Sequence, residues 1–457
     1  MSELEFIILA LNEWPTFVAL SVLFALVLFL SIRRVIVGGV FDPLVLALVV
    51  GYSVNYAVVA LLWLQGASGS YLSLLVLTYG VVMLVVFRWV SRSGKSSLVL
   101  DSVRALTPNI IGVHVYRFSI ALYLLLSSFI IASIGFGVFA ETNRFDAARG
   151  FGGYIRVLDF LGPFIVAYST AAIANAKRRS KLKIALLLLF IVYAAMVNGA
   201  KISVIFSLCT VFFTLSIIAI RVRISPATAL LGMAAGLAFS VLALSANLRL
   251  NNVEESGGDT ALTGSGLVLE RFAYRIIASG DSSYLLLPNN VIDQIATDSA
   301  FIRFLVPFIG ITKASQLFGY PVGDYSVGRQ ALLYYDPSNE VSGGPTSHFD
   351  LFAYVYFGPV GGFLFVALLA GLLGSINRAI RKTRRSRPNR PNHFRVALLA
   401  TLWTRAVLVI IEPTVALAYI VDVAIFFAVV SVTLQTLVTR RRPPAPSAGS
   451  DTAQGIA

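Results

Sequence analysis

The sequence of 457 residues is poor in charge and almost free of cysteine. Only 13% of its residues are charged, whereas soluble domains carry about 25%, which argues against a soluble globular protein. The single cysteine, Cys209, lies in an apolar run and leaves no intramolecular disulfide. The chain also lacks a D-x-D motif, a P-loop, an H-E-x-x-H pair and a nucleophile elbow. We therefore expect neither a metal site nor a cofactor.

Long apolar runs are what the sequence has instead. Hydrophobic residues make up 57% of the chain, and runs of about 17–25 of them, long enough to cross a hydrocarbon core, recur along it. Each run must satisfy its own backbone hydrogen bonds in lipid, so each is predicted to be a helix. The pattern predicts an all-α polytopic membrane protein with about 11 transmembrane helices. These spans are 15–32, 37–64, 71–87, 118–140, 157–176, 184–197, 202–220, 227–246, 351–374, 396–411 and 414–438.

The net charge of +14 does not indicate nucleic-acid binding, because the basic residues cluster at the ends of apolar runs. This is the positive-inside pattern, and it places the N-terminus outside and the C-terminus in the cytoplasm. With that orientation, 25 of the 36 Lys and Arg residues lie inside and 10 outside, with Arg405 within a span. Of the 22 acidic residues, only Asp42, Asp101 and Asp451 lie inside.

The domain organisation follows from the spacing of these spans. Residues 1–248 form a transmembrane bundle of eight spans, 249–350 a large external loop with amphipathic helices, and 351–439 the last three spans. Residues 440–457 form a disordered cytoplasmic tail, because they are rich in Pro, Ala and Ser. Long insertions are usually functional or disordered, and the aromatic content of this loop argues for function.

Two arginines in the loop are predicted to bind an anion. Arg271 and Arg275 are four residues apart in a stretch with helical apolar periodicity, L-V-L-E-R-F-A-Y-R-I-I, so they share one helix face. Two guanidinium groups on one face suit a phosphate or diphosphate. The alternative is a solvated helix face, on which Glu270 and Asp281 neutralise the arginines. Other external cations are candidates for substrate binding: Arg249, Arg303, Arg329 and Lys201.

His348 is the only histidine predicted to lie outside. It stands between a Gly-Gly-Pro turn and the ninth span, where it could act as a general base near neutral pH. A histidine at such a place can equally be a cap or a surface residue. Asp350, two residues on, either shares this role or only favours the helix N-terminus.

Arg405 lies in the middle of a predicted span. A charge buried in the membrane is costly and is a functional candidate, so we count Arg405 among the substrate-binding residues. The alternative is a structural ion pair with Glu412 or Asp422 of the last two spans.

The motifs of the loop resemble those of a known family. The loop contains G-Y-P-V-G at 319–323 and ends in S-H-F-D-L-F-A-Y-V-Y-F-G-P-V-G at 347–361. Together with the F-D-P entry to the second span and the N-G-A-K turn at 198–201, this order resembles the O-antigen and exopolysaccharide repeat-unit polymerases (the Wzy type) and the related O-antigen ligases. The resemblance covers the whole chain in layout, and the specific motifs cover about a tenth of it.

The resemblance implies a metal-independent C-type membrane glycosyltransferase in a bacterial inner membrane, with a periplasmic loop and N-terminus and a cytoplasmic C-terminus. It would polymerise undecaprenyl-diphosphate-linked oligosaccharide repeat units, with a chain-length regulator and a flippase as possible partners. Arg271, Arg275 and Arg249 would hold the diphosphate, with His348 as the base or positioning group. A His-Asn pair is common in ligases, whereas Phe349 follows His348 here, which favours a polymerase.

Other classes remain open beside the polymerase and the ligase. A lipid-linked sugar flippase or an anion permease would show internal repeats and charges in many spans, and we find neither. Dolichol-phosphate-type mannosyl and oligosaccharyl transferases resemble one another in an acidic residue on the first external loop, and residues 65–70 contain none.

Overall fold

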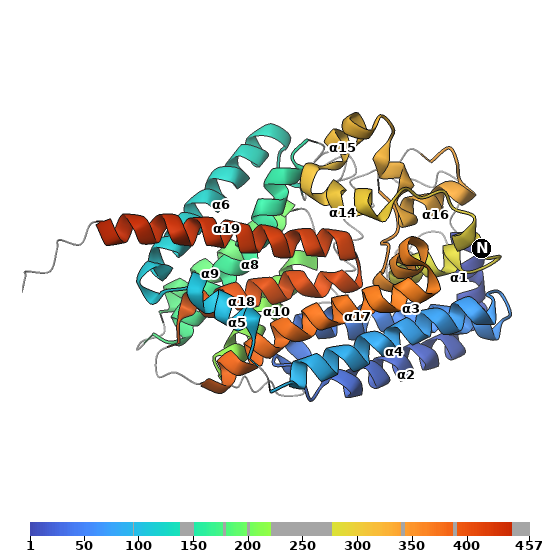
Figure 1. Cartoon of the computed structure of the whole chain (residues 1–457), viewed down its shortest axis with the longest axis horizontal. Coiled ribbons are helices and arrows are strands. Elements are labelled where there is room, and N and C mark those ends of the chain that lie inside the picture. The colour runs from blue at the N-terminus through green and yellow to red at the C-terminus, as the bar shows by residue number, and fades with distance from the viewer. Residues whose placement is uncertain are drawn as a thin grey trace, which may run out of the picture.

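The computed structural model describes residues 1–94, 96–137, 150–176, 180–198, 202–220, 277–339, 343–386 and 391–440. The chain is mostly helical in these ranges, and they contain no strand. Figure 1 shows long helices packed side by side, with a group of shorter helices at one end. The prediction of an all-α polytopic membrane protein is confirmed at this level.

Eight helical segments of the described part are long and apolar enough to cross a bilayer. They are α2 (Trp14–Ile32), η2 with α3 (Val45–Gly51 and Tyr52–Leu64), α4 (Ser70–Arg92), η3 with α6 (Asn109–Ile111 and Gly112–Ile134), α8 (Gly152–Ala174), α17 (Phe349–Ser386), α18 with η8 (His393–Ala406 and Val407–Ile410) and α19 (Pro413–Arg440). Two further helices, α9 (Lys181–Asn198) and α10 (Ile202–Ile217), occupy predicted spans six and seven. The predicted eighth span, 227–246, and the tail 441–457 lie outside the described residues.

Two of the helices extend beyond the predicted spans. Helix α6 begins at Gly112, before the span predicted from 118, and Gly112 and Val115 are buried against the bundle. Helix α17 continues to Ser386, past the span predicted to end at 374. The arginines that follow its apolar part mark the end of the membrane but favour the helix, since cations stabilise a helix C-terminus.

Helices α4 and α17 pack closely because glycines line their contact. A side-chain carbon at Gly374 would lie 2.8 Å from Cβ of Val90, so no larger residue fits there without displacing α4. At the other end of the pair, the Tyr79 hydroxyl donates to the carbonyl oxygen of Pro359 at 2.8 Å. Small residues at helix contacts are typical of membrane bundles. Helices α4 and α17 run side by side along the bundle (Figure 1).

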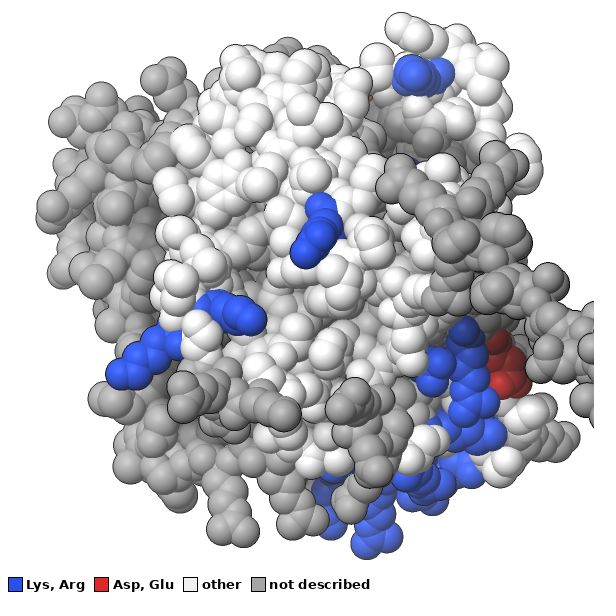
Figure 2. All heavy atoms as spheres, turned by 90° about the vertical axis from the view of Figure 1, so that its left-hand side faces the viewer, with Lys and Arg blue, Asp and Glu red and all other residues white. Residues whose placement is uncertain are grey.

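The two ends of the bundle differ. We call the end with α1 (Glu3–Asn12) and residues 277–348 the loop end; the N-terminus lies there (Figure 1). The described part of the predicted loop folds into short helices, including α13 (Asp281–Leu286), α14 (Ala300–Ile309), α15 (Ile311–Phe318) and α16 (Val327–Tyr335). The opposite end, the basic end, carries Arg33, Arg34, Arg92, Arg378, Arg381, Arg384, Arg385 and Arg395. Figure 2 faces this end and shows the densest group of Lys and Arg side chains toward one side of it, with others spread over the rest of the face.

Candidate functional site

The backbone of His348 is held in an unusual conformation at the loop end. Its φ of 43° lies in the left-handed region that few non-glycine residues adopt. Its N–H donates to the carbonyl oxygen of Ile411 at 3.0 Å, and its own carbonyl accepts from the N–H of Phe352 at 3.0 Å. Such strain persists only where surrounding contacts enforce it and is typical of functional sites.

The segment that leads to His348 packs tightly at glycines, where no larger residue fits. A side-chain carbon at Gly328, in α16, would overlap the carbonyl oxygen of Pro345, and one at Gly344 would lie 3.0 Å from the backbone of Arg329. The Ser282 hydroxyl of α13 donates to the carbonyl oxygen of Thr346. The Gly-Gly-Pro turn of the sequence therefore lies directly against α13 and α16, which position the histidine that follows.

Asp350 is fully buried in the first turn of α17. One carboxylate oxygen, Oδ1, accepts from the hydroxyl of Tyr52 on α3 at 3.0 Å and from the N–H of Leu351 at 2.9 Å. The other oxygen, Oδ2, has no hydrogen-bond partner. A buried carboxylate with one unused oxygen has capacity to accept a further hydrogen bond or a proton.

Further unpartnered polar atoms lie on His348, two residues before Asp350, and on the face of α3 that carries Tyr52. Nδ1 of His348, the hydroxyl of Tyr56 and Nδ2 of Asn55 are all buried and without hydrogen-bond partners. The ring of Tyr52 lies 5.1 Å from those of both His348 and Tyr56. Because buried polar atoms are normally paired, this group, which we call the polar cluster, is the strongest candidate site in the described part of the chain.

Burial determines the charge state of His348. It lowers the pKa of this imidazole to about 4, because the charged form loses its hydration. His348 is therefore neutral near pH 7 and a weak base. Its neighbour Glu412 accepts from the N–H of Ser347 at 3.0 Å; burial raises the pKa of Glu412, while this hydrogen bond and the charge of Arg303 lower it.

Two predicted binding residues, Arg303 and Arg329, have partners inside the loop. Arg303 is 7% exposed, forms an ion pair with Asp298 and donates to the carbonyl oxygen of Val322 at 2.8 Å. Arg329 donates to Asp324 at 3.3 Å and to the side chain of Asn339 at 2.8 Å. Both therefore hold the loop together, although Nε of Arg303 lacks a partner.

The predicted partners of Arg405 are wrong. Its guanidinium donates to the carbonyl oxygen of Asp159 on α8 and lies over the ring of Tyr419, 5.0 Å from the centroid. Asp422, one of the predicted partners, forms an ion pair with Arg156 instead. The sequence could not show this, because α8 packs against α18 and α19 only in the folded bundle.

The remaining predicted site residues lie outside the described residues. These are Arg271, Arg275, Arg249 and Lys201. Their roles stay predictions, and so does the alternative pairing with Glu270. Asp281, the other partner considered for the two arginines, begins α13, where burial raises its pKa to about 7.

The residues of α3 in the polar cluster were not among those predicted from the sequence. Tyr52, Asn55 and Tyr56 stand at i, i+3 and i+4 and so share one helix face, a polar face in an otherwise apolar span. That spacing was visible in the sequence and could have marked the face as functional. Its partner, Asp350, is 298 residues away, so only the fold reveals the pair.

The described helices define a multi-pass membrane protein that has a cluster of buried, unpartnered polar atoms at its loop end. No protein-family model matches the chain, and no curated protein or solved structure is similar to it. In the described ranges, no group of three or more His, Cys, Asp and Glu side chains could hold a metal ion. The geometry of the site is therefore the basis for any function.

Proposed function

We propose that this chain polymerises undecaprenyl-diphosphate-linked oligosaccharide repeat units at the outer face of a bacterial inner membrane. The observation that carries the proposal is the polar cluster, in which a neutral imidazole and a half-paired carboxylate lie buried beneath a folded loop. Such groups can accept a proton in a site that excludes bulk water. The loop motifs that resemble repeat-unit polymerases contain two of these groups, His348 and Asp350.

The proposed reaction is a single glycosyl transfer. The hydroxyl oxygen of the acceptor repeat unit forms a bond to the anomeric carbon of the growing chain, and the bond from that carbon to the diphosphate oxygen breaks. The hydroxyl proton moves to Nδ1 of His348, and the electron pair leaves with undecaprenyl diphosphate. Asp350 belongs to the same polar cluster through Tyr52, which donates to its carboxylate and whose ring lies 5.1 Å from that of His348, and its negative charge favours the imidazolium that forms.

The diphosphate leaving group needs cations, and the proposal assigns Arg271 and Arg275 to it, with Arg249 in support. Bidentate arginine contacts suit a diphosphate, and stabilisation of the departing charge lowers the barrier. The binding of this anion also raises the pKa of His348, so that the base becomes effective only when the donor is present. Metal independence is part of the proposal, since arginines take the place of a divalent cation.

The proposal is tested with purified protein in nanodiscs and lipid-linked repeat units as the only substrates. We expect a ladder of products that differ by one repeat unit, and the same ladder in EDTA. In a parallel reaction that also contains lipid A core, transfer of a single glycan to that core, without a ladder, would indicate an O-antigen ligase. Movement of intact lipid-linked glycan across a vesicle membrane, without glycosidic bond formation, would indicate a transporter, and either result would overturn the proposal.

The proposed orientation is tested separately by cysteine labelling. In a Cys209→Ser background, a cysteine at Ser256 is expected to react with a membrane-impermeant reagent in cells with a permeabilised outer membrane. A cysteine at Ser447 is expected to react only after the inner membrane is opened. Labelling of the Ser447 position in intact inner membranes would place the loop end in the cytoplasm and exclude a periplasmic site.

A further inference from the structure

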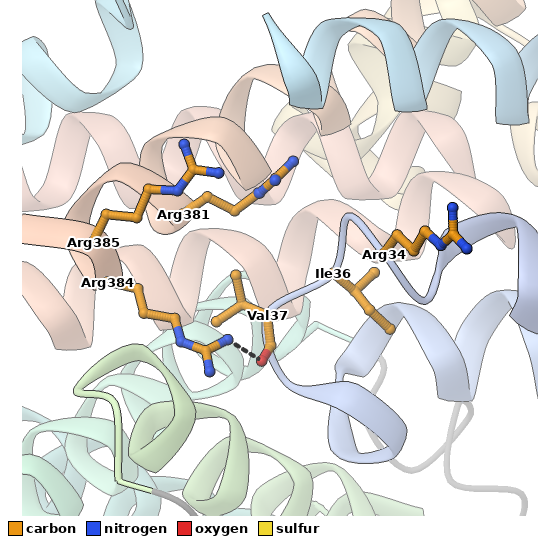
Figure 3. A pocket seen from close by; sticks show the side chains of 6 residues that line it. All are labelled: Arg34, Ile36, Val37, Arg381, Arg384 and Arg385. Atoms are coloured by element: carbon orange, nitrogen blue, oxygen red, sulfur yellow. Dashed lines mark hydrogen bonds between the residues drawn. The ribbon is translucent and has the colours of Figure 1, made fainter. Parts of the chain in front are cut away.

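A pocket opens at the basic end, far from the polar cluster. It has a volume of about 500 Å³ and is lined by Arg34, Ile36, Val37, Arg381, Arg384 and Arg385. Figure 3 shows the three arginines of α17 on one side of it and the segment with Arg34, Ile36 and Val37 across from them. Arg381 and Arg385 are four residues apart and Arg384 lies between them, so all three point to one side of the helix.

The fold holds two of these arginines in place and leaves much of their charge unused. Nη1 of Arg384 donates to the carbonyl oxygen of Val37 at 3.0 Å, and Nη1 of Arg381 donates to that of Ser91 at 3.0 Å. Each guanidinium has five N–H donors, so both retain donors for a ligand. Arg34 and Arg385 are exposed and donate no hydrogen bond within the described part of the chain.

No described carboxylate neutralises the pocket. The ion pairs of the described residues involve none of its four arginines. At this end, Asp101 pairs with Arg104, and Asp42 is buried with both its oxygens hydrogen-bonded. Like charges at a spacing of four repel each other, so four arginines around one pocket favour a bound anion.

Membrane topology alone does not account for this geometry. The positive-inside pattern requires cations near the ends of spans but not a pocket or arginines fixed by backbone carbonyls. The position suits a lipid phosphate, because the arginines begin at Arg378, directly after the apolar part of α17, at the depth of the headgroups. Basic pockets between transmembrane helices at the cytoplasmic surface bind anionic headgroups.

We propose that this arginine pocket binds a phosphate group, supplied by an anionic phospholipid headgroup or by a soluble phosphate. Arg381 and Arg384 form its fixed wall, and Arg34 and Arg385 close over the ligand from opposite sides. The site is independent of the proposed glycosyl transfer, since it lies at the other end of the bundle. Arginine rather than lysine matters here, because the guanidinium fork binds phosphate oxygens in pairs.

The test uses variants that keep the charge and change the geometry. In Arg34→Lys/Arg385→Lys the positive charge needed for topology remains, while the bidentate contacts are lost. The matched control is Arg33→Lys/Arg117→Lys, two exposed arginines outside the pocket lining. Each purified full-length protein is delipidated, its melting temperature is measured, and its adducts are counted by native mass spectrometry after incubation with phosphatidylglycerol, phosphatidylcholine or inorganic diphosphate.

We expect the wild type and the control to retain phosphatidylglycerol, and the pocket variant to bind it roughly tenfold more weakly, as expected for lost charged hydrogen bonds. Retention of phosphatidylglycerol but not of diphosphate identifies a lipid headgroup as the source, and the reverse identifies a soluble phosphate. Equal binding by the wild type and the pocket variant, or no adduct on the wild type, would overturn the proposal. Equal melting temperatures show that the variant is folded.

Discussion

Asp42 and Asp350 are two fully buried aspartates of the same bundle with opposite surroundings. Both oxygens of Asp42 are used: Oδ2 accepts from the N–H groups of Val37 and Gly38 at 3.2 and 3.0 Å. Oδ1 accepts from the N–H of Leu44 at 3.1 Å and from the indole of Trp403 at 2.7 Å. Asp350 uses only one oxygen, on Tyr52 and Leu351.

The difference separates an aspartate that holds the fold together from one that is available for chemistry. Burial raises the pKa of Asp42, and its four hydrogen bonds lower it, so the carboxylate joins the entry of the second span to α18. The unused oxygen of Asp350 stabilises nothing in the described structure. A buried polar atom without a partner costs free energy, and a substrate or proton that pairs with it recovers that cost.

The largest expected effect comes from the removal of the imidazole of His348, which belongs to the same polar cluster as Asp350. His348→Asn keeps a residue type that tolerates a left-handed backbone but lacks a basic nitrogen. We expect polymer formation to fall by about 10²–10⁴-fold, the usual contribution of general acid–base catalysis, with little change in melting temperature. The control is His114→Asn, at an exposed histidine. Normal ladder formation by His348→Asn would remove the base from the mechanism.

The two aspartates themselves give the next prediction. In Asp42→Asn an amide NH₂ faces two of the four N–H donors, and each unsatisfied donor costs about 1–3 kcal/mol, so we expect a loss of roughly 2–6 kcal/mol in unfolding free energy. In Asp350→Asn the NH₂ takes the place of the unpartnered oxygen and no existing hydrogen bond is lost, so we expect a smaller loss of stability than in Asp42→Asn while activity falls at least about tenfold. The measurements are thermal unfolding and the ladder assay.

Equal losses of stability in the two asparagine variants would show that the unused oxygen of Asp350 is structurally engaged and would break the comparison. A fall in activity of Asp42→Asn without a loss of stability would show that Asp42 also takes part in the chemistry, which would contradict the comparison too. Each variant thus serves as the control for the other.

The buried imidazole of His348 makes the free energy of unfolding depend on pH, and this dependence tests whether the polar cluster is as buried as Asp350 indicates. Because burial lowers its pKa to about 4 from 6.5, the unfolded chain binds more protons than the folded one between these values. Stability therefore rises as pH increases from about 4 to 6.5, by about 3 kcal/mol for this group. Unfolding free energies measured across this range are expected to show a smaller slope for His348→Asn than for the wild type; identical slopes would contradict a buried neutral imidazole.

A smaller effect is expected at the two loop arginines, which the proposal places on the diphosphate. The loss of one charged hydrogen-bond partner costs about 1.5–3 kcal/mol, or roughly 10- to 150-fold in rate. Arg271→Ala and Arg275→Ala are expected to lose activity to this extent, and the lysine variants less, because they keep the charge but not the fork. If both alanine variants make as much polymer as the wild type at equal protein levels, these arginines lie on a solvated helix face and not in the site.

The sequence predicted the fold better than the site, for a physical reason. A span is recognised from the length and apolarity of one segment, as the agreement of α2 with the predicted 15–32 illustrates. A site depends on contacts between distant segments. His348 and Asp350 were found because they flank a span, but the face of α3 beneath them was not, and Arg405 was given the wrong partners.

The break at Gly358 within α17 has a consequence for how the helix is aimed. Gly358 adopts a φ of 67° and a ψ of −179°, so the turn of about 100° per residue does not carry through it. The outer piece can direct Asp350 toward Tyr52, while the inner piece independently directs Asn377 toward the hydroxyl of Ser91 at 3.0 Å. One glycine thus frees a single helix from a fixed angular relation between its two halves.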